Sequence, residues 1–107
     1  MQEGNVLRNK KRVGVIRRND EGVYFFQYDE RYLADTVSKP ISVRLPLQKE
    51  AFRSKYLFSF FYQLLAEGSL KKLQCKEHKI DADDDFSRLL KTAKEDTIGS
   101  ITIEETL

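Results

Sequence analysis

An alternation of side chains near the N-terminus constrains the fold of this chain most strongly. Residues 13–17 (VGVIR) repeat with the period of two expected for a half-buried strand, with Val13, Val15 and Arg17 on one face. Turn-forming residues flank this segment, Asn-Lys-Lys at 9–11 and Asn-Asp-Glu-Gly at 19–22. Because the flanking segments are also rich in β-formers, residues 5–28 are predicted to form a three-stranded antiparallel meander.

Two short elements are predicted to follow the meander. Asp29 can cap a helical turn over residues 30–34, because its carboxylate reaches the free amides of that turn. Pro40 and Pro46 bracket the alternating segment 41–45, and neither proline can donate to a β-ladder. We therefore expect a short or edge strand at residues 41–45.

The clearest helical pattern covers residues 55–67. Its apolar residues have the i, i+4, i+7, i+8 spacing of one buried stripe, and they are Leu57, Phe61, Leu64 and Leu65. Ser54 is the predicted N-cap, and Gly68 is the predicted left-handed stop. This helix is expected to be the main core element.

The remaining sequence predicts two more helices and a closing strand. A weak helical pattern includes Leu70, Leu73, Cys75 and Ile80, and a clear one includes Phe86, Leu89, Leu90 and Ala93. A β-branched segment then contains Thr97, Ile98, Ile101, Thr102 and Ile103 and can return to pair with the meander. The predicted fold class is α+β, a small antiparallel sheet packed with about three helices in a single domain over residues 1–107.

Composition favours a compact domain in a reducing compartment. Apolar residues make up 40% and charged residues 34% of the 107 residues, a balance typical of a solvated globular protein. A single cysteine, Cys75, excludes an intramolecular disulfide and a paired-cysteine zinc site. No apolar run approaches the ~20 residues needed to span a bilayer, and residues 1–5 lack the apolar stretch of a signal peptide. We expect a cytoplasmic protein with no membrane partner.

Basic residues are concentrated near the N-terminus. The first twenty residues contain six basic and two acidic side chains, a net charge of +4. Such a hairpin can attract a phosphate backbone, and the aromatic segment 24–28 (YFFQY) between arginines resembles a base-stacking strand. A solvated edge and ordinary cross-strand packing explain the same residues, so direct nucleic-acid binding is kept as an alternative.

The motifs that would support catalysis or metal binding fail on inspection. Cys75 and His78 have helical spacing, but no oxyanion motif accompanies them. Asp81, Asp83 and Asp85 match the start of a calcium loop, whose sixth and twelfth positions are then phenylalanine and threonine instead of glycine and glutamate. The acidic run is instead expected to cap the next helix. No glycine-rich phosphate loop occurs, and we expect no catalytic residue, cofactor or metal.

Ordered landmarks along the chain carry a resemblance to a known family. They are Gly14-Val15-Ile16, Gly22, Phe26-Gln27-Tyr28-Asp29, Tyr32-Leu33, Pro40-Ile41-Ser42, Leu45-Pro46-Leu47, Phe60-Phe61, Leu64-Leu65-Ala66-Glu67-Gly68 and Glu95-Asp96-Thr97-Ile98-Gly99-Ser100. In this order they resemble the N-terminal subdomain of HipA-type toxin kinases. In that family the subdomain precedes a serine/threonine kinase core that phosphorylates an aminoacyl-tRNA synthetase, and no kinase catalytic motif follows Gly99 here.

The resemblance implies a binding function. A free-standing copy resembles HipS, the antitoxin of tripartite systems whose partners are the kinase HipT and the helix-turn-helix repressor HipB. We therefore expect an antitoxin that binds a HipT-like kinase and a HipB-like repressor, with DNA contacted only through the complex. A stand-alone or degenerate subdomain with a structural role is the alternative.

The predicted partner-binding residues are Glu67, Gly68, Ser69 and Leu70, at the end of the predicted main helix. The resemblance implies that, in some HipS-like proteins, a tryptophan near this turn is inserted into the kinase. Ser69 stands at that place and the chain has no tryptophan, so Leu70 or another face must act instead. Ala66 and Lys94 also differ from the proline and glycine that are common in the family.

Overall fold

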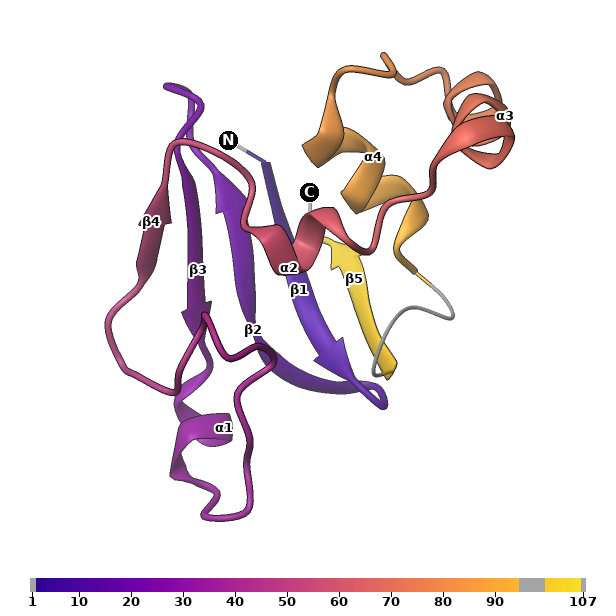
Figure 1. The fold of residues 1–107 in the computed structure, drawn as a ribbon. Helices are drawn as coiled ribbons and strands as arrows, with labels where there is room; N and C mark the ends of the chain where they lie inside the picture. The colour runs from indigo at the N-terminus through magenta and orange to yellow at the C-terminus, as the bar shows by residue number, and fades with distance from the viewer. Residues whose placement is uncertain (1, 95–99, 107) are drawn as a thin grey trace.

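Five antiparallel strands form the sheet in this computed structural model, which describes residues 2–94 and 100–106. Their order is β4-β3-β2-β1-β5 (Figure 1). The strands are β1 (Gln2–Arg8), β2 (Lys11–Arg18), β3 (Tyr24–Tyr28), β4 (Phe52–Ser54) and β5 (Ile101–Glu105). The predicted meander is confirmed as β1 to β3, and the closing segment returns as β5 beside β1. Residues 97 and 98 of that segment lie outside the described residues.

Within the described part of the chain, four helices accompany the sheet, so the predicted α+β class is confirmed. They are α1 (Glu30–Ala34), α2 (Ser59–Tyr62), α3 (Gly68–His78) and α4 (Asp85–Thr92). Figure 1 shows α2 and α4 beside the sheet, α3 beyond α4, and α1 at the opposite end of the strands. Among the described residues, no helix is long and apolar enough to cross a membrane.

The core lies between the sheet and the α2 and α4 segments. Phe26 of β3 is fully buried and lies 5.5 Å from the ring of Phe61 on α2. From α4, the predicted stripe of Phe86, Leu89, Leu90 and Ala93 is buried as expected. Burial of each large apolar side chain of this kind stabilises the fold by about 1.5–3 kcal/mol.

The prediction that Val13 shares a face with Val15 and Arg17 in β2 was wrong. Val13 and Ile16 are both fully buried, although strict alternation would put them on opposite faces. The register shifts between Val6, which pairs with Gly14, and Leu7, which pairs with Arg12. Val13 is therefore the extra residue of a β-bulge, and such a bulge re-aims the side chain at that position.

The predicted strand at residues 41–45 is also wrong. These residues form turns with one isolated bridge between Ser42 and Leu45. Tyr28 explains the conformation, because its buried hydroxyl donates to the Leu45 carbonyl and accepts from the Ile41 amide at 3.1 Å. Burial raises the pKa of the Tyr28 phenol, so the hydroxyl keeps its proton for this donation.

The main predicted helix is much shorter than expected. Only Ser59–Tyr62 is helical within residues 55–67, and Ser54 ends β4, a strand that the sequence did not predict. Three consecutive aromatic residues, which have modest helix propensity, occupy α2. Their rings pack tightly instead, and Phe60 and Phe61 meet edge to face at 5.3 Å. Within this segment of turn and loop, Phe61 is fully buried and the other three residues of the stripe are partly buried.

Two capping assignments also change. Gly68 has φ +62°, but it begins α3 and does not end a helix. Asp29 precedes α1 without a side-chain cap bond, and its carboxylate faces Arg12 Nε at 3.8 Å. An ion pair with the neighbouring hairpin therefore replaces the expected cap.

Candidate functional site

The chain from α2 to α3 forms the best candidate site, and it includes the predicted partner-binding residues. Glu67, Gly68, Ser69 and Leu70 are all exposed and lie together at the start of α3. Glu67 is the N-cap of α3 by position, yet its side chain makes no cap bond. An added Cβ at Gly68 would meet nothing within 4 Å. The structure therefore leaves this turn accessible.

A shallow hollow of about 220 Å³ adjoins the turn. It is lined by Tyr62, Leu65, Ala66, Glu67, Gly68, Lys71 and Arg88. These residues come from α2, from the turn, from α3 and from α4. We use "the α2–α3 surface" for this hollow together with Ser69, Leu70 and Leu73.

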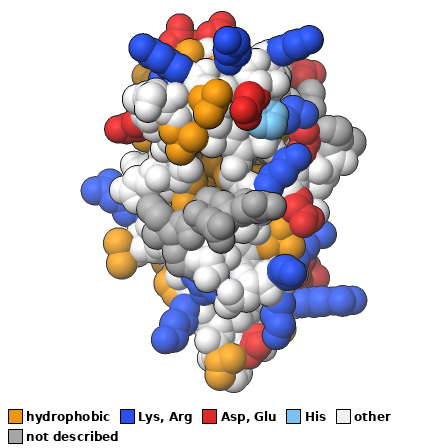
Figure 2. All heavy atoms as spheres, turned by 90° about the vertical axis from the view of Figure 1, so that its right-hand side faces the viewer, with side chains coloured by type: hydrophobic (Ala, Val, Ile, Leu, Met, Phe, Trp, Pro, Cys, Tyr) orange, Lys and Arg blue, Asp and Glu red, His pale blue; other side chains and the backbone are white. Residues whose placement is uncertain are grey.

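Large apolar side chains on the α2–α3 surface remain half exposed. The exposed fractions are 50% for Tyr62, 53% for Leu70 and 51% for Leu73. Figure 2 shows orange side chains among blue and red ones over the upper part of the face on which α3 lies. The weak helical pattern that includes Leu70 and Leu73 is confirmed as α3, and none of the α3 residues is buried.

Basic residues surround this apolar area. Lys71, Lys72 and Lys76 lie on α3, whereas Glu77 is its one acidic residue. The last turn also carries the exposed His78. An apolar centre with a cationic rim fits a partner with an apolar and acidic surface.

Arg88 of α4 holds the turn before α3 in position. Its side chain is only 4% exposed, and it donates to the Ala66 carbonyl at 2.5 Å and to the Asp85 carboxylate at 3.0 Å. The guanidinium therefore connects α4 to the chain immediately before Glu67. Sequence analysis missed this residue, because an arginine on the apolar side of a helix has no signal other than its position between Asp85 and Leu89.

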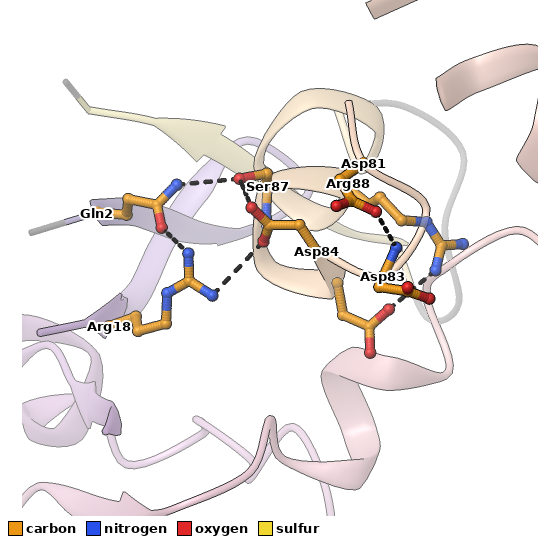
Figure 3. A network of polar contacts seen from close by, with 8 residues as sticks. Gln2, Arg18, Asp81, Asp83, Asp84, Ser87 and Arg88 are labelled. Carbon is orange, nitrogen blue, oxygen red and sulfur yellow. Dashed lines mark hydrogen bonds and ion pairs between the residues drawn. The ribbon is translucent and has the colours of Figure 1, made fainter. Parts of the chain in front are cut away.

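A polar network holds the start of α4 against the sheet (Figure 3). Asp84 accepts from the Ser87 amide at 3.1 Å and from its hydroxyl at 2.8 Å, so the predicted capping by the acidic run is confirmed. Arg18 of β2 lies 3.5 Å from Asp84, and Gln2 of β1 donates to Ser87 at 3.1 Å. Arg18 also lies 5.5 Å from the centre of the Phe86 ring. The network therefore has a structural role.

Substitution of Asp84 measures how much this network contributes to the free energy of unfolding. Burial raises the pKa of the Asp84 carboxyl, but hydrogen bonds from Ser87 and the charge of Arg18 together outweigh it, so the pKa lies below its ordinary value. Asp84→Ala is expected to lower the free energy of unfolding at neutral pH by about 1 kcal/mol, because the cap is lost. Asp84→Asn should cost less, since asparagine also caps helices.

The pH dependence of this pair has a defined sign. A depressed folded-state pKa means that the Asp84 carboxylate stabilises the protein above its unfolded-state pKa and loses that contribution as the pH falls through the folded-state value. The difference in urea midpoint between the wild type and Asp84→Asn should therefore shrink from about pH 7 to about pH 2. A constant difference would contradict the ionic contribution.

The remaining candidate groups do not assemble into a reactive site. Cys75 is half buried, and His78 is exposed three residues away on α3. Asp81 accepts from the Asp83 amide at 2.9 Å, and Asp85 pairs with Arg88. Within residues 2–94 and 100–106, no three His, Cys, Asp or Glu side chains gather as metal ligands would. The aromatic segment of β3 is used for packing, since Tyr24 meets Phe86 edge to face at 5.6 Å.

Comparisons with known proteins agree with this architecture. The family model for the HipA N-terminal domain matches residues 4–104. An uncharacterized protein of Haemophilus influenzae is 30% identical over 105 residues, which cover 98% of this chain and 93% of the relative. A solved structure described as the N-terminal domain of HipA toxin has a TM-score of 0.72 and 27% identity, covering all of this chain and 94% of that one. The chain belongs to the HipA N-terminal domain family.

Proposed function

We propose that this protein is a non-catalytic antitoxin that binds a HipT-like or HipA-like serine/threonine kinase through the α2–α3 surface. The observation that carries the proposal is the half-exposed apolar group of Tyr62, Leu70 and Leu73 beside a turn that Arg88 holds in place. Stable partners commonly bury such apolar centres behind a polar rim. We infer the kinase partner from family membership, because a HipA toxin carries a domain of this family.

Inhibition in this proposal needs binding and no turnover. A bound partner occupies the kinase stoichiometrically, and its effect follows mass action. Leu70 takes the role of the inserted anchor in the absence of a tryptophan, because it projects from the first turn of α3 beside Gly68. A HipB-like repressor is a second proposed partner, and assembly without inhibition is the alternative role.

Co-expression with a HipT-like kinase core tests the proposal. The wild-type chain should co-purify with the kinase and relieve its growth arrest. Leu70→Asp and Leu73→Asp should each weaken binding by roughly 30-fold or more, because each places a charge where an apolar anchor is buried. Isothermal titration calorimetry on the purified pair measures the change.

Val43→Asp is the matched control. Val43 is 94% exposed and lies in the loop of residues 41–45, outside the α2–α3 surface. The same substitution there should leave affinity for the kinase unchanged. Equal losses of kinase affinity in Val43→Asp and Leu70→Asp would reject this surface as the binding site. A kinase that stays toxic and never co-purifies with the chain would reject the antitoxin function. Co-purification without relief of growth arrest would favour the assembly role.

A further inference from the structure

Residues of the β1–β2 turn, of α1 and of the loop after α1 line a second and larger hollow. These segments lie at the end of the sheet away from α3 (Figure 1). The volume of this hollow is about 520 Å³, within the range of small-molecule sites. Five basic side chains line it, and they are Arg8, Lys11, Arg12, Arg31 and Lys39. Asp35 is the one acidic residue in the lining, and Asn9, Ser38, Tyr32, Val13 and Val37 complete it.

Most of the positive charge in this basic pocket is not neutralised. The side chains of Lys11, Arg31 and Lys39 make no hydrogen bond or ion pair with any of the described residues, and all three residues are exposed. Arg12 faces Asp29 at 3.8 Å with half of its side chain exposed, which is a weak surface pair. Like charges gathered in one concavity repel one another, and a bound anion relieves that repulsion.

Two groups in the pocket are held in fixed positions. The Tyr32 hydroxyl accepts from Arg8 at 2.9 Å and donates to the Lys39 carbonyl. The Tyr32 ring stacks on Tyr28, with centroids 5.9 Å apart and planes 6° from parallel. This arrangement orients the Arg8 guanidinium and occupies one face of the tyrosine ring. The pocket therefore offers oriented donors rather than a platform for stacking bases.

We propose that the basic pocket binds phosphate groups. A phosphate carries nearly two negative charges and three strong acceptor oxygens, whereas a carboxylate carries one charge and two oxygens. Five cations, with Asp35 in the lining and Asp29 beside Arg12 as their acidic neighbours, match the former better, and arginine binds phosphate through paired N–H groups. The phosphate can come from a small polyphosphate or from a nucleic-acid backbone, whose phosphodiesters carry one charge each but follow one another along the strand. This site goes beyond the proposed antitoxin function and uses none of the α2–α3 surface.

Thermal unfolding with sodium tripolyphosphate tests the pocket directly. Since a ligand of the folded state stabilises it by mass action, tripolyphosphate should raise the Tm of the wild type more than sodium chloride of equal ionic strength. The triple variant Lys11→Ala/Arg31→Ala/Lys39→Ala should bind tripolyphosphate at least about tenfold more weakly in calorimetry. It should still fold, because the three side chains are exposed and make no polar contacts with the described residues.

A charge-matched variant separates the pocket from general electrostatics. Lys72→Ala/Lys76→Ala/Lys94→Ala removes the same charge from exposed positions outside the pocket and should retain tripolyphosphate binding. An equal loss of tripolyphosphate affinity in the two triple variants would overturn the proposal. Equal effects of chloride and tripolyphosphate on the Tm of the wild type would also overturn it. A glutamate-rich peptide that binds as tightly as tripolyphosphate would also overturn it.

A second arm distinguishes the two phosphate sources. Binding to a labelled 20-base-pair duplex, followed by fluorescence anisotropy against salt, should show a log-log slope that decreases by about 1 for each lost phosphate contact in the pocket variant. Duplex binding that tripolyphosphate displaces would support a nucleic-acid backbone, and tripolyphosphate binding alone would support a small ligand. Binding of neither probe would overturn the site, whatever the kinase experiments show.

Discussion

Gly14→Ala is expected to destabilise the protein severely. A Cβ added at Gly14 would lie 2.3 Å from the Gln27 carbonyl oxygen and 3.1 Å from Phe26 Cε1. Gln27 belongs to β3, which pairs with β2 along its whole length, so relief of the clash requires two paired strands to separate. We expect a loss of about 3 kcal/mol or more, at the upper end of overpacking costs. Against a total stability of about 5–15 kcal/mol, this is a large fraction.

Gly4→Ala is the matched control for Gly14→Ala. Gly4 lies on β1, and its added Cβ would approach Leu90 Cδ2 at 2.8 Å and Ile103 Cγ2 at 2.9 Å. Leu90 Cδ2 ends a side chain and can move by rotation, whereas Ile103 Cγ2 is bonded to Cβ and moves only with the whole buried side chain. Because side chains yield more easily than paired backbone, the loss should be smaller than in Gly14→Ala, about 1–2 kcal/mol. Urea denaturation followed by circular dichroism measures both values, and each kcal/mol corresponds to about 4–8 °C in Tm. Equal stabilities of the two variants would contradict the backbone clash.

The sheet could be predicted from the sequence because its signals are local. Turn residues at 9–11 and 19–22 separate segments with a period of two, and β1, β2 and β3 follow directly. The closing strand was also predicted, since Ile101 and Ile103 are β-branched and both are buried. The bulge at Val13 was not predicted, because it depends on the register with β1, which no local pattern encodes.

The conformation of the segment between β3 and α3 was predicted wrongly, because it depends on tertiary contacts and not on local signals. A helix over residues 55–67 was inferred from apolar spacing, but aromatic packing between Phe26, Phe61 and their neighbours determines the conformation. Spacing reports which residues are apolar, whereas tertiary contacts decide how those residues are buried. β4 was missed because three residues are too few to show a period, and it is ordered by pairing with β3.

The candidate site was predicted only in part. Residues 67–70 were chosen because they follow the predicted main helix, whereas the structure places Glu67 before α3 and the other three in its first turn, where all four are exposed. The half-exposed Tyr62 and Leu73 beside them were missed, because a sequence does not show whether an apolar helix face is covered. The basic pocket was missed as a unit, since α1 and the β1–β2 turn meet only in the folded chain. The sequence shows the N-terminal charge, but it does not show that Arg31 and Lys39 lie beside it.

Arg88→Leu should both destabilise the protein and weaken kinase binding. The substitution removes the donor to the Ala66 carbonyl and leaves the Asp85 carboxylate without its partner. An acceptor left unsatisfied costs about 1–3 kcal/mol when buried, and the Ala66 carbonyl is part-buried. We therefore expect about 2 kcal/mol in total, because leucine preserves most of the packing. The turn that carries Glu67 to Leu70 then loses its anchor, so affinity for the kinase should fall although Arg88 is almost completely buried.

Asp85→Asn separates these two effects. It weakens the ion pair with Arg88 but leaves the hydrogen bond from Arg88 to Ala66 in place. Since Asp85 is one-third exposed, its loss of charge should change the free energy of unfolding by less than about 1 kcal/mol. Kinase affinity should remain near the wild-type value in Asp85→Asn and fall in Arg88→Leu, measured by calorimetry at a temperature where both variants are fully folded. If Arg88→Leu lowers stability while kinase affinity stays unchanged, the turn does not require this anchor for binding, and the contact must be formed mainly by Leu70 and Leu73 on α3 itself.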